Sequence, residues 1–153
     1  MLKNYTSQVP ASRSIAYIES VLALHKATQI IKQYSVSGYV KSIAFSMMVN
    51  GVPVHFMLPA QVGNCYMVLR GQIRRYRPDM EKRLLEQAER TAWKIVSDWT
   101  DAQMAMIDLA QVELTEVFLP YVYDPKHDRT LYQVVKQFGV NDLFPALPEK
   151  VEK

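Results

Sequence analysis

One short stretch of the chain gathers imidazole and carboxylate groups that could do chemistry. Of the three histidines, at positions 25, 55 and 127, His127 stands between Asp124 and Asp128. Groups at this spacing could hold a metal ion or supply a general base. The same residue types are common in polar loops, and Asp128 could instead cap a helix. We favour the loop interpretation and expect no metal site.

Other reactive residue types are isolated. Asp101 and Asp108 lie two helical turns apart, Glu113 and Glu116 three residues apart, and without a nearby histidine we interpret them as a solvated face. Cys65 has no activating neighbour in sequence, so we expect an inert thiol. The sequence contains no phosphate-loop, dinucleotide-binding, nucleophile-elbow or zinc-protease motif. We therefore expect neither catalytic residues nor a cofactor, and an enzyme ranks third among the functions considered.

Arginine is concentrated in one place. Arg70, Arg74, Arg75 and Arg77 fall within eight residues, and guanidinium groups suit phosphate better than ammonium groups do. This cluster predicts a surface that binds phosphate. Arginines at the end of a helix also interact favourably with the carbonyl dipole, which is the structural alternative.

Two lysines and two tyrosines extend this prediction. If residues 28–34 form a strand that returns through a four-residue turn, Lys32 lies opposite Lys41 and Tyr34 lies opposite Tyr39. Lysines flanked by tyrosines suit a phosphate backbone with base stacking, and Tyr76 would add an aromatic ring beside the arginines. The alternative is a solvated sheet end where the lysines point apart.

Charge is segregated along the chain. Residues 1–60 carry five basic side chains and one acid, residues 61–94 carry eight and four, and residues 95–123 carry five acids and no basic residue. Such asymmetry can indicate an anionic partner for the basic part. It can equally mean that the two parts complement each other, in the fold or in a dimer.

A β-hairpin must position the lysines. Asn50 and Gly51 form the dipeptide that a type I′ turn requires. Counting outward from the turn places eight apolar side chains on one sheet face, in four pairs: Val49 with Val52, Met47 with Val54, Phe45 with Phe56, and Ile43 with Leu58. Residues 28–34 could continue the preceding helix, but Gly38 and its serine neighbours favour a third strand.

Helices surround this hairpin. Pro10 and Ser12 or Ser14 can begin a helix with Ile15, Ile18 and Leu22 on one face. Apolar spacing predicts a second helix over residues 60–76. Residues 79–121 hold no proline or glycine before Pro120, so they predict one long helix, or two that fold back near residues 98–101. Asp128 or Thr130 could cap a short helix that directs Leu131, Val134, Val135 and Phe138 inward and ends at Gly139. In the tail, Leu143 and Phe144 are expected to pack.

These elements predict an α+β fold. We expect a three-stranded antiparallel sheet over residues 28–58, packed by helices and followed by a long helix or helical hairpin over 79–119 and a short C-terminal helix. A chain of 153 residues is normally one domain, here an α-β-β-β-α half over 10–76, a helical half over 79–139 and a tail over 140–153. No segment predicts a membrane span or a signal peptide, so we expect a cytoplasmic protein.

A second candidate surface lies in residues 102–119, which are apolar on several sides as well as acidic. A helix of this kind is either central in the fold or shared with another subunit. It therefore predicts a homo-oligomer or a protein partner, and its contact residues would be Met104, Ile107, Asp108, Val112 and Glu116.

Two resemblances add to these expectations. The order helix, three strands, helix over residues 12–76 resembles the topology of the double-stranded RNA-binding domain, although residues 60–69 lack the basic start of that domain's second helix. The segments HKATQIIKQY, VNGVPVHFMLPA and ERTAWKIVSDW resemble a group of small, functionally uncharacterised proteins from bacterial prophages and mobile elements. That resemblance implies a setting in which nucleic-acid handling or interference with a host protein is common.

Two functions remain. The leading prediction is a non-catalytic nucleic-acid-binding accessory protein of phage type, which contacts the phosphate backbone through Lys32, Lys41 and the four arginines. The alternative is a protein-interaction module, an inhibitor or assembly factor, that uses the acidic and apolar segment 102–119.

Overall fold

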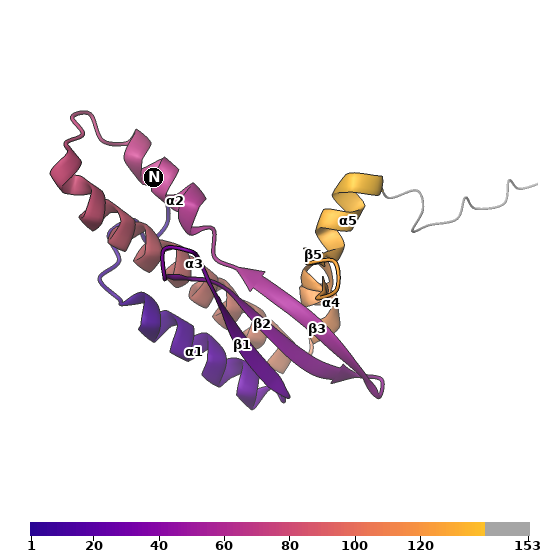
Figure 1. Cartoon of the computed structure of the whole chain (residues 1–153). Coiled ribbons are helices and arrows are strands. Elements are labelled where there is room, and N and C mark those ends of the chain that lie inside the picture. Colours follow the sequence, from indigo (N-terminus) through magenta and orange to yellow (C-terminus); the bar gives the residue numbers. More distant parts are fainter. Residues whose placement is uncertain (140–153) are drawn as a thin grey trace, which may run out of the picture.

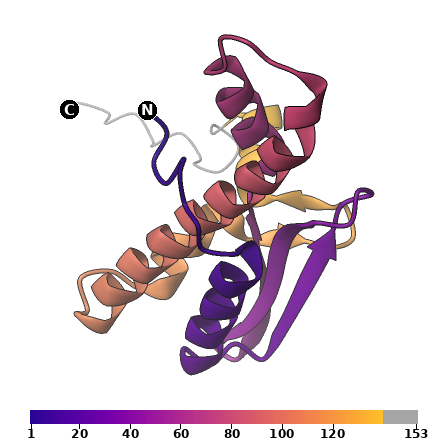
Figure 2. The same ribbon diagram turned by 90° about the vertical axis from the view of Figure 1, so that its left-hand side faces the viewer.

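The computed structural model describes residues 1–139, and these form the expected α+β fold (Figure 1). Strands β1 (Gln29–Tyr34), β2 (Val40–Val49) and β3 (Val52–Pro59) make an antiparallel sheet in the order β1-β2-β3. Helix α1 (Ala11–Leu24) and the long helix α3 (Glu81–Asp108) run beside each other against it, and α2 (Val62–Gly71) packs on the first half of α3 (Figure 2). The buried cluster draws side chains from β2, β3, the three helices and Phe118, and the half-buried Ile30 of β1 packs against it.

The β2–β3 hairpin has the predicted register. Asn50 and Gly51 have φ values of 52° and 79°, as a type I′ turn requires, and all four predicted residue pairs are present. Five of the eight predicted inward side chains are buried, namely Ile43, Phe45, Met47, Phe56 and Leu58, whereas Val52 beside the turn is 59% exposed. The rings of Phe45 and Phe56 stack at 5.1 Å between centroids. Alternation along two paired strands therefore determined this part of the core.

Residues 28–34 contain a strand, as predicted, but its register on β2 differs from the prediction. Lys32 pairs with Ile43 rather than Lys41, and Tyr34 pairs with Val40 rather than Tyr39, with a β-bulge at this end of the ladder. The loop is one residue longer than expected, because the Ser35 N–H bonds the Tyr39 carbonyl at 2.8 Å. The total shift of two residues preserves the core face of β1 and keeps the two lysines from facing each other.

Helix α2 is shorter than the predicted helix over 60–76, because it ends at Gly71. Glycine weakens the helix at that point, and Pro78 holds the preceding Arg77 in an extended conformation with φ −129° and ψ 145°. A single 3₁₀ turn, η1 (Pro78–Met80), then leads into α3. Residues 72–77 form a loop from which Ile73 and Tyr76 still pack against the core.

The segment 79–121 forms a helical hairpin with unequal arms. Helix α3 continues without a break through residues 98–101, and the chain turns only after Asp108. Ala110 has φ 54°, and the Gln111 N–H bonds the Met106 carbonyl at 3.0 Å, so a Schellman motif ends the helix. The short arm is α4 (Leu114–Phe118), followed by the 3₁₀ turn η2 (Leu119–Tyr121).

The C-terminal part forms a small hairpin and a helix. Strands β4 (Tyr123–Asp124) and β5 (Arg129–Thr130) pair on either side of the polar loop predicted around His127, and α5 (Leu131–Phe138) follows. Thr130 caps α5 as predicted, because its hydroxyl accepts the Gln133 N–H at 3.3 Å, and Gly139 ends the helix at φ 84°. The inward orientation predicted for Phe138 is wrong, since 58% of this residue is exposed. Leu143 and Phe144 lie outside the described residues.

Candidate functional site

The clearest basic surface is the connection between α2 and α3. Arg74, Arg75 and Arg77 are exposed in residues 72–77, which we call the arginine loop. This connection forms one end of the molecule, opposite the tip of the β2–β3 hairpin (Figure 1). The structure thus presents three of the four predicted arginines together on a projecting edge.

A network of side chains holds the arginine loop against the two helices. The Glu81 carboxylate, in the first turn of α3, accepts hydrogen bonds from the Tyr66 hydroxyl at 2.9 and 3.0 Å and from the Tyr76 hydroxyl. The Arg70 guanidinium lies over the Tyr76 ring, 3.3 Å from its centroid. Tyr66 comes from the middle of α2 and Arg70 from its last turn, so these four side chains, the Glu81 network, connect both helices and the loop.

The pKa values show that this network keeps one charge state near neutral pH. The Tyr76 and Tyr66 hydroxyls, with the charge of Arg70, hold the pKa of the Glu81 carboxyl below its ordinary value. The carboxylate in turn raises the pKa of both tyrosines above their ordinary value of about 10. Glu81 therefore stays ionised and both phenols stay protonated over the neutral range.

Two further basic residues belong to this edge and were not predicted. Lys82 and Arg83 are exposed in the first turn of α3, directly after Glu81. Residues 70–83 thus carry six basic side chains and two acids. One of these acids, Asp79, lies 3.5 Å from the Arg77 Nε in a pair that is largely exposed. The run of positive charge through Arg83 was visible in the sequence, but only the turn between the helices places it on one edge.

The other predicted basic residues lie apart from the arginine loop or contact other side chains. Lys32 forms an ion pair with Glu19 of α1 at 2.9 Å, and Lys41 is exposed on β2 beside the bulge. Arg70 is stacked on Tyr76. The structure therefore does not combine the two lysines and the four arginines into one surface.

The predicted aromatic supports are also dispersed. Tyr34 is 59% exposed at the end of β1, and Tyr39 is packed against the core. The face of the Tyr76 ring is occupied by Arg70. None of the three lies free beside Arg74 and Arg75.

The predicted interaction surface is largely interior or internally bonded. Met104 is only 3% exposed and belongs to the core, and Ile107 packs against it. Glu116 completes a capping box with Glu113 at the start of α4, and Val112 is half-buried in the turn before it. The prediction of Met104 as a contact residue is therefore wrong, because α3 is covered by α1 and the sheet at this point.

The acids of α3 bind the N-terminal part of the chain. Asp108 lies 2.9 Å from the His25 Nε2, and Asp101 accepts a hydrogen bond from Tyr17. Asp98 accepts from Lys94 at 2.8 Å and from the Asn4 amide at 2.9 Å. Much of the segregated charge is thus complementary within the fold.

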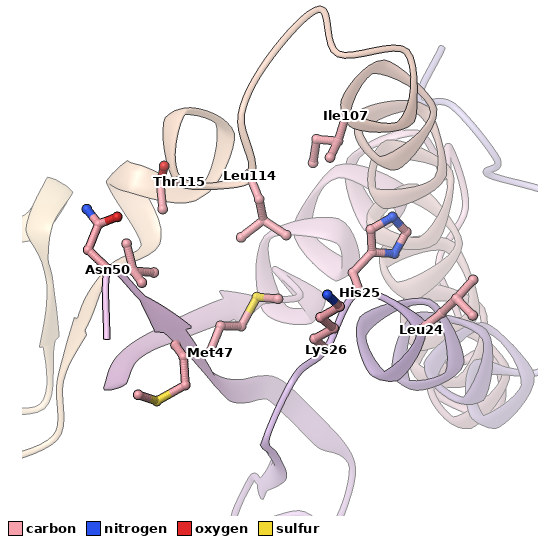
Figure 3. Close-up of a pocket in the computed structure, with 10 residues that line it drawn as sticks. Leu24, His25, Lys26, Met47, Asn50, Ile107, Leu114 and Thr115 are labelled. Atoms are coloured by element: carbon pink, nitrogen blue, oxygen red, sulfur yellow. The ribbon is translucent and has the colours of Figure 1, made fainter. Parts of the chain in front are cut away.

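A groove of about 480 Å³ opens between the end of α1, the β2–β3 hairpin and the turn from α3 to α4 (Figure 3). Figure 3 shows Met47, Ile107 and Leu114 pointing into it, with His25 and Lys26 on the α1 side. Leu24, which is 80% exposed, lines it as well. The groove is lined by both apolar and polar side chains, which come mainly from α1, β2, α3 and α4.

The residues considered first have structural roles. His127 Nδ1 contacts the Asp124 carboxylate at 2.5 Å and Tyr123 donates to Asp128 at 2.6 Å, all on the surface of the β4–β5 turn. Within residues 1–139, no three His, Cys, Asp or Glu side chains are grouped as a metal site would require. Cys65 is buried, and burial raises the pKa of its thiol, so little reactive thiolate forms at neutral pH.

A search for membrane-spanning helices and three comparisons with known proteins complete the description of the chain. Among the described residues, no helix combines the length and apolar character that crossing a membrane would require. No family model, curated protein or solved structure matches this chain.

Proposed function

We propose that this protein binds nucleic acid without catalysis, through phosphate contacts made by the arginine loop and the first turn of α3. The observation that carries the proposal is the exposure of Arg74, Arg75, Arg77, Lys82 and Arg83 on one edge. On the resemblance of its segments to prophage proteins, it would act as an accessory protein of a phage or mobile element.

Physical chemistry supports a phosphate ligand at this edge. Guanidinium groups form paired, charge-assisted hydrogen bonds with phosphate oxygens. The amino end of α3, a helix of 28 residues, adds a favourable dipole. Contacts of this type position a nucleic acid but do not read its bases, so we expect binding with little sequence preference.

Charge reversal tests the proposal. The triple variant Arg74→Glu, Arg75→Glu, Arg77→Glu should lose most of its affinity for short fluorescent DNA and RNA duplexes at low salt, measured by anisotropy. The control reverses Arg13, Lys126 and Lys136, which are exposed outside this edge and change the net charge equally. Absence of wild-type binding at low salt, or equal losses in both triple variants, would contradict the proposal.

The groove supports a second candidate, a protein-interaction module. Leu24 and Met48 line it and are 80% and 55% exposed, so an apolar side chain of a partner could be buried there. We expect a stoichiometric partner in pull-downs from bacterial lysate, which Leu24→Asp removes and Met67→Asp retains. Met67 is the control because it is 66% exposed on α2, outside the groove. The same capture by all three proteins would rule the groove out as the contact.

A further inference from the structure

The Glu81 carboxylate is negatively charged, yet it lies within the surface that we propose binds phosphate. The position of this carboxylate therefore needs a physical reason. A carboxylate beside Lys82 and the arginine loop repels an anionic ligand, so electrostatics alone would make Glu81 a hindrance. The same carboxylate accepts hydrogen bonds from two tyrosines that come from different parts of the chain. Glu81 therefore connects α2 and the arginine loop through hydrogen bonds, and this structural contribution opposes its electrostatic repulsion of an anion.

The network acts at the two points where the arginine loop joins the helices. Tyr66 is in the middle of α2 and Arg70 in its last turn, and Glu81 is the first residue of α3. Tyr76 lies inside the loop, with its hydroxyl bonded to Glu81 and its ring covered by Arg70. Arg75 and Arg77 are the immediate neighbours of Tyr76 in the chain. Because the Tyr76 side chain is held in place, the backbone positions of these two arginines are restrained as well.

We infer that Glu81, Tyr66, Tyr76 and Arg70 are positioning residues that hold the arginine loop in the conformation that binds phosphate. This inference rests on the proposed function. A loop held in its binding conformation loses less conformational entropy when it meets its ligand, and so binds more tightly than a mobile loop of equal charge. Arg70 thus contributes through Tyr76, whereas Arg74, Arg75 and Arg77 contact the ligand.

Two substitutions that change the net charge equally should affect the affinity for DNA differently. Glu81→Ala and Asp79→Ala each remove one negative charge from the same edge. Asp79 is exposed and has only the loose pair with Arg77, so its loss should leave duplex DNA affinity equal or slightly higher. Glu81→Ala should lower affinity about threefold or more, because the loop is released. Tighter binding by Glu81→Ala, as by Asp79→Ala, would overturn the inference.

A variant that changes no charge separates the effect of the lost hydrogen bonds from the effect of the lost carboxylate charge. Tyr66→Phe with Tyr76→Phe deletes both hydroxyl donors and keeps the ring under Arg70. Its control is Tyr17→Phe with Tyr123→Phe, which deletes two hydroxyls bonded to Asp101 and Asp128 elsewhere. We expect weaker DNA binding from the first pair only, with an unchanged salt dependence because no charge is lost. Equal affinity in both pairs would overturn the inference.

Limited trypsin digestion separates this inference from the proposed function. Trypsin cleaves after arginine unless a proline follows, so the Arg77–Pro78 bond resists it. The cleavage rates after Arg74 and Arg75 report local opening of the loop. Cleavage there should be faster in Glu81→Ala and in the Tyr66→Phe, Tyr76→Phe pair than in the wild type or the two controls. Wild-type protein that binds no duplex DNA would refute the proposed function and this inference with it. Binding that none of the network variants weakens would refute the inference alone.

Discussion

At the scale of single residues, His25 joins two helices at a titratable contact. Its Nδ1 lies 2.9 Å from the Val21 carbonyl oxygen, and its Nε2 lies 2.9 Å from the Asp108 carboxylate. Because both partners are acceptors, only the doubly protonated ring donates to both. The Val21 carbonyl, and then Asp108, raise the pKa of His25 above its ordinary value, against the effect of burial.

This contact predicts a pH-dependent stability. With a raised pKa in the folded state, the stabilisation is complete below the unfolded pKa of about 6.5 and is lost as pH rises through the folded pKa. The free energy of unfolding, measured by urea denaturation, should therefore fall over this interval. His25→Gln should flatten the profile. An unchanged profile in His25→Gln would contradict the prediction.

At the scale of elements, the end of α3 determines where the chain reverses and α4 begins. Ala110 occupies the left-handed position of the Schellman motif with φ 54°, where glycine is usual. This conformation costs a residue with a Cβ roughly 1–2 kcal/mol. The turn nevertheless forms, because it allows Phe118, which is fully buried, to reach Phe45 and Trp99.

The strain at Ala110 predicts a stabilising substitution. Ala110→Gly should raise the free energy of unfolding by about 0.5–1 kcal/mol, since part of the relief is offset by the greater freedom of glycine in the unfolded chain. The control is Ala102→Gly, an exposed position inside the same helix, which should lower it by about 1 kcal/mol. Loss of stability in both variants would show that Ala110 is not strained.

At the scale of the whole molecule, the charged side chains fall into two groups: acids of α3 with partners inside the fold, and basic residues exposed at the α2–α3 connection. The acids of α3 secure α1 and the N-terminal residues, as Asp98 does with the Asn4 amide and Asp108 with His25. The arginine loop and the first turn of α3 leave positive charge on an edge beyond these contacts. The sequence asymmetry thus reflects internal complementarity in part, and it leaves an exposed basic edge for which we propose an anionic partner.

The number of basic side chains on this edge sets the salt dependence of the proposed binding. If Arg74, Arg75, Arg77, Lys82 and Arg83 each neutralise one phosphate, log K for a duplex should fall with log salt at a slope of roughly −4 to −5. Reversal of the three arginines should make the slope about three units shallower.

The apolar segment 102–119 no longer supports an oligomer in the way first expected. Met104 and Phe118 are buried within one chain, and Leu114 and Val117 pack against the same core. The breadth of the apolar pattern reflects the end of the long helix α3 and the short helix α4, which both pack against the same core.

The sequence by itself determined the elements whose signals are local. Asn50 and Gly51 specify a turn of one type, and alternation then fixes which side chains of β2 and β3 face the core. Thr130 and Gly139 mark the two ends of α5 in the same way. Such signals depend on backbone preferences of a few neighbouring residues, so no tertiary information is needed to interpret them.

Only the tertiary structure decided where α3 ends, how β1 aligns with β2, and which basic residues share a surface. Ala110 carries no turn signal, and the chain reverses there because burial of Phe118 outweighs local strain. Lys32 turned out to pair with Glu19 of α1, and Arg70 with Tyr76 across the loop. Residue types and spacing name the groups that can bind phosphate. Long-range packing decides which of them remain exposed and held in place, because each helix end settles where it buries the most apolar surface.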